Sequence, residues 1–212
     1  MKTLFKVVVA LVAVGALAVL FVRSAQSTRS EPFTIARQDL PGWTLTLAPA
    51  DDPLGALLSI TPKAGLMSSL SNQLFARMGE SLHYPPAAMP VVLRREFQDA
   101  MAGTVTPQAL LAAARDAGLE SATFRPQCMA QRRLSSPGLV RAVYFVVFDV
   151  PQFAQFREQA AQRLRAAGGD TSRFDPLALS PVLIAADLEG SFSRWLPLRA
   201  DQGDCFAPVA VE

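Results

Sequence analysis

The only histidine of the 212 residues, His83, is the best candidate for acid–base chemistry in this chain. It follows Glu80 and Ser81 in the sequence GESLHYPPAAMP. A serine hydrolase requires a serine, a histidine and a carboxylate that meet in space. Ser81 lies in no G-x-S-x-G turn, and closeness along the chain does not create that geometry. We therefore interpret His83 as structural or solvated, and a hydrolase that uses His83 with a nearby serine or carboxylate is the alternative.

Cys128 and Cys205 are the only cysteines. A zinc site generally requires about four cysteine and histidine ligands, and the chain has three such residues in total. No CxxC pair is present for redox catalysis. We predict a disulfide between the two, which in the chain-entropy model contributes about 4–5 kcal/mol. We find no phosphate-binding glycine loop or dinucleotide fingerprint, and we predict neither a metal nor a cofactor.

Two arginine pairs, Arg94–Arg95 and Arg132–Arg133, could hold an anion such as a phosphate. Paired arginines on an amphipathic element more commonly place one side chain in solvent and the other against a carboxylate. We favour this second interpretation, because nothing in the sequence shows that the pairs converge. Asp149 precedes a proline that opens a helix, and we expect its carboxylate to cap that helix.

The first half of the chain contains two strand patterns and one helix pattern. We expect strands over 43–47 and 54–60, a helix over 66–78 and a proline-rich loop over 79–90. The helix carries no charge between Lys63 and Arg77. Such a helix usually packs on a core through its apolar stripe, and a helix that meets a protein partner, a lipid or a ligand groove is the alternative.

The second half predicts an alternation of helices and strands. From Thr106 onward the order is helix, strand, strand, helix, strand, which indicates an α+β domain with a mixed sheet, with a ferredoxin-like split βαβ unit as one form. The expected segments are helices over 91–102, 107–117 and 151–167, and extended segments over 121–124, 128–134, 140–150, 180–186 and 191–198. A right-handed crossover through the helix at Pro151 would make the strand at Val182 parallel to the strand at Val143.

The N-terminus is an export signal of one of two kinds. Lys2 and Lys6 precede an uncharged apolar run from Val7 to Val22, which Arg23 ends. This run is slightly long for a signal peptide and slightly short for a membrane span. We favour an uncleaved anchor over residues 4–22 in the bacterial inner membrane, with the C-terminal part in the periplasm. Cleavage near Ser27, which would release a periplasmic or secreted protein, is the alternative.

The domain organisation follows from this signal. We expect a signal-anchor or signal peptide over 1–23, a polar tether over 24–40 and one exported α+β domain over 41–212. Three of the 20 basic residues lie in the first 23, which leaves 17 against 18 acidic ones. The exported part is thus near −1, and a nucleic-acid partner is not expected.

Two classes of function fit these observations. The favoured class is a noncatalytic cell-envelope protein that binds another envelope component, with a protein or a lipid as the partner. The alternative is the small exported hydrolase based on His83.

Overall fold

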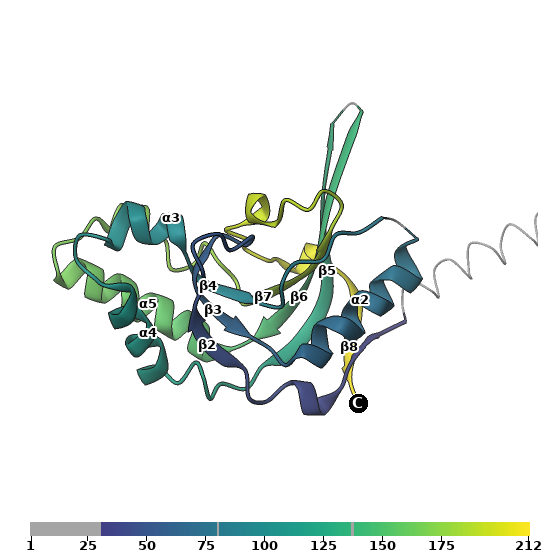
Figure 1. The fold of residues 1–212 in the computed structure, drawn as a ribbon, viewed down its shortest axis with the longest axis horizontal. Helices are drawn as coiled ribbons and strands as arrows, with labels where there is room; N and C mark the ends of the chain where they lie inside the picture. Colours follow the sequence, from purple (N-terminus) through teal and green to yellow (C-terminus); the bar gives the residue numbers. More distant parts are fainter. Residues whose placement is uncertain (1–30, 80, 137) are drawn as a thin grey trace, which may run out of the picture.

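The computed structural model describes residues 31–79, 81–136 and 138–212, and these residues form an α+β domain. They contain four α-helices and eight strands, arranged as a five-stranded mixed sheet and a three-stranded antiparallel sheet (Figure 1). The predicted α+β class and the mixed sheet are therefore confirmed. The predicted anchor over residues 4–22 and the cleavage point near Ser27 lie outside the described residues. Within the described ranges, we find no helix with the length and apolar character required to cross a bilayer.

The larger sheet has the strand order β1-β8-β5-β6-β7. Its only parallel pair among the described strands is β1 with β8, and the other neighbours are antiparallel. The strand bounds are β1 Phe33–Ile35, β5 Arg125–Ser136, β6 Leu139–Asp149, β7 Val182–Asp187 and β8 Cys205–Val211.

The smaller sheet has the order β2-β3-β4, with bounds Thr44–Leu47, Ala56–Thr61 and Met89–Leu93. Pro90 lies on β4, an edge strand, and pairs with Ser59 of β3. A residue without an N–H group is tolerated on an edge strand. All five residues of β4 are buried.

The helices occupy the two ends of the domain. Helix α2, Ala64–Met78, lies against β1 and β7, whereas α3 Arg94–Glu96, α4 Pro107–Asp116 and α5 Pro151–Ala166 gather at the opposite end (Figure 1). The predicted caps of α4 are present: Thr106 Oγ1 accepts a hydrogen bond from the Ala109 amide at 3.2 Å, and Pro107 opens the helix. Gly118 follows with a φ of 75°, a left-handed conformation that glycine adopts without a steric penalty.

One continuous hydrophobic core joins the two sheets. The Trp43 ring of the segment before β2 stacks on Phe124 with 4.0 Å between centroids, and it meets the edge of Phe148 from β6 at 5.3 Å. All three rings are at most 2% exposed. The two sheets therefore share one core, because aromatic residues from both contribute to it.

The chain path after β6 differs from the expected crossover. Strands β6 and β7 are adjacent and antiparallel, with Val147 opposite Val182. The ferredoxin-like split βαβ unit is therefore not formed. After α5 ends, residues 167–181 return the chain to the sheet. Strand β7 therefore begins at the end of the sheet where β6 finishes. The right-handed rule applies only to parallel neighbours and does not constrain this connection.

Three further boundaries need correction. The expected tether over 24–40 is wrong from Phe33 onward, because Phe33 and Ile35 of β1 are each 1% exposed and pair with β8. The helix expected from Val91 begins three residues later, because 91–93 belong to β4; short runs that are apolar on both faces do not distinguish helix from strand. The extended segment expected over 191–198 contains a 3₁₀ turn, Phe192–Trp195, and the outer strands of the larger sheet are β1 and β7.

Candidate functional site

The surroundings of His83 do not form a catalytic triad among the described residues. Its main chain makes an antiparallel bridge to Asp187, with N–O distances of 2.8 and 2.9 Å. Its side chain is exposed and lies against Gly190, where an added Cβ would come within 3.4 Å of the ring. Within the described ranges, no hydroxyl or carboxylate forms a hydrogen bond with this imidazole. Ser81 is exposed, and Glu80 lies outside the described residues. The hydrolase alternative stays a prediction.

The predicted disulfide is confirmed. Cys128 and Cys205 are bonded, with 5.7 Å between their Cα atoms, within the usual range for a disulfide. The bond links β5 to the start of β8, next to the pair formed by Ala130 and Cys205. The disulfide therefore holds β8 against β5 at the position beyond which β5 continues without β8 as a neighbour.

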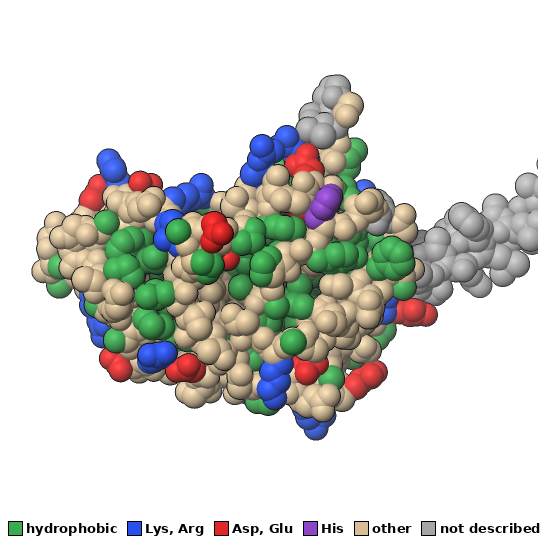
Figure 2. Space-filling model, viewed as in Figure 1, with side chains coloured by type: hydrophobic (Ala, Val, Ile, Leu, Met, Phe, Trp, Pro, Cys, Tyr) green, Lys and Arg blue, Asp and Glu red, His purple; other side chains and the backbone are tan. Residues whose placement is uncertain are grey.

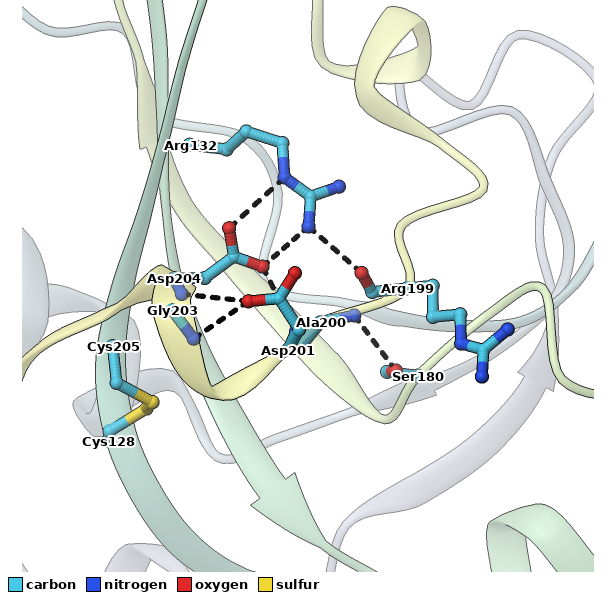
Figure 3. Close-up of polar contacts among 9 residues, drawn as sticks. All are labelled: Cys128, Arg132, Ser180, Arg199, Ala200, Asp201, Gly203, Asp204 and Cys205. Carbon is cyan, nitrogen blue, oxygen red and sulfur yellow. Dashed lines mark hydrogen bonds and ion pairs between the residues drawn. A yellow bond between two sulfur atoms is a disulfide. The ribbon is translucent and has the colours of Figure 1, made fainter.

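A cluster of polar side chains also connects β5 to the turn before β8, near the disulfide (Figure 3). The Asp204 carboxylate accepts hydrogen bonds from Nε and Nη2 of Arg132, with 3.2 Å to Nε. Arg132 Nη2 also donates to the Arg199 carbonyl at 2.9 Å. The side chain of Asp201 accepts from the amides of Gly203 and Asp204, at 2.7 and 3.2 Å. The turn before β8 is thus closed on itself and tied to β5 by a charge-assisted pair.

Beyond this base, β5 and β6 continue as a projecting hairpin, which we call the arm and define by its described residues, 131–136 and 138–142. The arm extends away from the body of the domain (Figure 1). Strand β8 pairs with β5 at 128–130, and β7 pairs with β6 at 143–147. Within the described arm residues, the strands pair only with each other, apart from one bond from the Leu188 amide to the Ala142 carbonyl.

The arm exposes two large apolar side chains. Leu134 is 56% exposed and Val140 is 52% exposed. They lie on opposite faces, because Leu134 faces Arg141 across the ladder whereas Val140 faces Ser135. Arg141 forms an ion pair with Glu189 on the body, with Nε–Oε1 3.1 Å, so one face of the arm is supported at its root.

The Arg132–Arg133 pair does not converge on one site. Successive strand residues point to opposite faces. Arg132 binds Asp204, and Arg133 Nη2 donates to the Tyr144 hydroxyl at 3.2 Å. The anion-clamp interpretation of this pair is therefore wrong, and the favoured interpretation, an arginine held by a carboxylate, is confirmed for Arg132.

The Arg94–Arg95 pair does converge, on a cavity of about 330 Å³ that Gln98 and Ser193 also line. Each guanidinium group already serves the fold. Arg94 Nη2 donates to the carbonyls of Ala48, Pro49 and Ala56 at 2.8–3.2 Å, and Arg95 Nη2 donates to the Leu196 carbonyl at 2.7 Å. The pair therefore ties the segment after β2, the start of β3 and the loop after β7 to the start of α3.

The predicted cap at Asp149 is not present. The cap position of α5 is Val150, no side chain there accepts a hydrogen bond, and Asp149 is exposed. Asp149 does not reach the cap position because it still belongs to β6, where it pairs with Arg125.

Three buried charged groups, Arg157, its partner Glu96 and Asp187, were not predicted. Arg157 lies on the buried side of α5, is 0% exposed and binds Glu96. Its position four residues after Phe153 on the apolar stripe of α5 is the signal that could have indicated it. Asp187 at the end of β7 is also 0% exposed, and it accepts hydrogen bonds from the amides of Glu189, Gly190 and Ser191. Arg157 and Asp187 hold loops to the core.

These observations describe a domain from which one hairpin projects, and the described residues form no grouping of three or more histidine, cysteine or acidic side chains suited to a metal ion. Comparison with known proteins gave no match among family models, curated proteins or solved structures.

Proposed function

We propose that this chain is a noncatalytic binding protein of the bacterial cell envelope, held at the inner membrane by residues 4–22, that engages another envelope protein through the arm. The observation that carries the proposal is the projection of the arm beyond both neighbouring strands. An extended two-stranded ribbon with unpaired outer edges presents main-chain donors and acceptors to a partner strand.

The side chains of the arm support binding to an extended protein segment. A partner strand that pairs with an edge contributes main-chain hydrogen bonds, and pockets for alternate side chains give specificity. Leu134 and Val140 supply apolar surface on the two faces of the arm. Burying an exposed leucine or valine side chain contributes about 1.5–3 kcal/mol.

The base of the arm supports the same role. An isolated two-stranded hairpin has little stability in water. Here the disulfide and the Arg132–Asp204 pair hold the root of the arm to β8. A binding element that is already ordered loses less conformational entropy when its partner binds.

Site-specific photocrosslinking in the native envelope tests the arm. The full chain carries a photoreactive residue at position 134, or at position 177 as a matched control. Leu177 is 60% exposed, close to the 56% of Leu134, and lies outside the arm. We expect a discrete heterologous protein adduct from position 134, and no such adduct from position 177. Equal labelling from both positions would contradict the proposal.

The tether is tested separately, on untreated membranes. We expect the full chain to remain in the membrane pellet after alkaline extraction and to retain its original N-terminus. A mature protein that begins at Thr28 would show that the chain is released.

A further inference from the structure

The outward side of α2 carries no charge. We define the outer face of α2 by its exposed residues Ser68, Asn72, Phe75 and Ala76, which recur at helical spacing on the side opposite the buried stripe. Phe75 is 71% exposed, the highest value among the large hydrophobic side chains that the structure describes. A phenylalanine presented from an uncharged helical surface has no packing role within the domain.

A second aromatic residue lies beside this face. The hydroxyl of Tyr84 reaches the Ser71 carbonyl of α2 at 3.5 Å, and the tyrosine is 38% exposed. Pro86, in the same segment, is exposed as well. Figure 2 shows hydrophobic side chains gathered on this side of the domain, beside the point where the described chain begins.

The start of the described chain is fixed to the last turn of α2. Arg77 donates to the carbonyls of Glu31 and Pro32, at 2.6 and 2.8 Å from Nη1 and Nη2, and its guanidinium lies 4.1 Å from the centre of the Phe33 ring. The described chain therefore begins beside Arg77, which follows Phe75 by two residues on α2.

The sequence before this point limits how far the domain can lie from an anchor. Residues 24–30 separate Arg23, the end of the apolar run, from Glu31. Seven residues span at most about 25 Å when fully extended. If residues 4–22 cross the membrane, as proposed above, the C-terminal end of α2 is held within that distance of the bilayer surface.

We propose that the outer face of α2, with Phe75 and Tyr84, lies in the headgroup region of the same bilayer. This inference rests on the proposed anchor. Aromatic side chains are favoured at the membrane interface, where an apolar ring enters the acyl boundary and a polar tip remains hydrated. The absence of charge on the outer face means that contact with lipid requires no charged group to lose its water.

Tryptophan fluorescence of the full chain in lipid vesicles tests the contact. The variant is Phe75→Trp, and Leu177→Trp is the matched control because Leu177 is also exposed, at 60%. The native Trp43 and Trp195 are 2% and 9% exposed, so the spectrum of the unmodified chain supplies the background. We expect the emission of the tryptophan at position 75 to shift to shorter wavelength and to be quenched by brominated acyl chains. The emission at position 177 should show neither change.

The outcomes separate this inference from the proposed anchor. A chain that floats with the vesicles but shows the same emission at positions 75 and 177 overturns the membrane contact and leaves the anchor in place. A shift to shorter wavelength that brominated lipid does not quench shows that protein covers Phe75, and also overturns the contact. A chain that does not float with vesicles overturns the anchor and the contact together.

Discussion

Arg157 and Glu96 form a buried ion pair that joins α5 to the end of α3. The distance from Arg157 Nη2 to Glu96 Oε1 is 2.7 Å, and the side chains are 0% and 9% exposed. Arg157 also donates to the carbonyls of Val91, Asp175 and Pro176, at 2.8, 2.8 and 3.0 Å. One guanidinium group thus connects β4, α3 and the loop before β7.

We expect Arg157→Met to lower the free energy of unfolding by about 3–5 kcal/mol, because it leaves Glu96 buried without its partner. Urea denaturation monitored by circular dichroism measures the change. Arg163→Met is the control, because Arg163 lies exposed on the same helix and its loss should change stability by no more than about 0.5 kcal/mol. Similar losses in the two variants would show that the ion pair is not a principal support.

Glu96→Gln should also destabilise the domain, and the double variant Glu96→Gln with Arg157→Met should lose less than the sum of the two single losses. In the double variant, the second substitution removes a charged group whose partner is already absent, so it costs less stability than it does alone. A double-mutant cycle in urea gives the coupling free energy. Simple additivity would contradict the pairing.

We expect replacement of both cysteines by alanine to lower stability by about 2–5 kcal/mol. The 77-residue separation of Cys128 and Cys205 means that the bond constrains a long loop of the unfolded chain. Thermal unfolding measures the loss, with reduction of the unmodified protein as the parallel condition. Alkylation without reductant should modify no cysteine in protein expressed in the periplasm, and the appearance of two alkylated thiols would refute the pairing.

Asp187→Ala should lower the free energy of unfolding by about 1–3 kcal/mol, because its buried carboxylate accepts the amides that close the turn after β7. Asp149→Ala is the matched control: it removes a carboxylate from the end of the adjacent strand β6, where the side chain is exposed. Chemical denaturation of both variants makes the comparison. Equal stability of the two would contradict a structural role for Asp187.

The hydroxyl of Ser172 lowers the pKa of Asp170 below its ordinary value, with the Ser172 amide and the charge of Arg173 adding to the effect. A carboxyl whose pKa is depressed in the folded protein stabilises the fold above its unfolded pKa, and this contribution is lost as pH falls through the folded pKa. Ser172→Ala should therefore raise the pKa of Asp170 towards the ordinary value of about 3.9. NMR titration of the carboxyl carbon measures the shift, and an unchanged titration would contradict the hydrogen bond.

Local patterns predicted several elements well. The stripe of leucines and methionines predicted α2, and the Thr106–Pro107 start with Gly118 after the end predicted α4. These signals succeed because helix periodicity and capping depend on residues within a few positions of each other. The disulfide could be predicted because there were only two cysteines to pair.

Other elements had no local signal. Strand β1 is three residues long and β8 lies at the end of the chain, and each becomes a strand by pairing with a segment far away in sequence. Whether Arg132 and Arg133 converge could not be predicted either, because their directions depend on which side of β5 faces Asp204.

The sequence by itself determined the α+β class, the disulfide, the ends of α4 and the uncharged character of α2, because each depends on composition or on short-range spacing. Tertiary structure alone decided that β7 runs antiparallel to β6, that β5 and β6 project as an arm and that Arg157 and Glu96 meet. Those features depend on how segments separated by tens of residues pack together, and the free energy of that packing is not encoded in any local pattern.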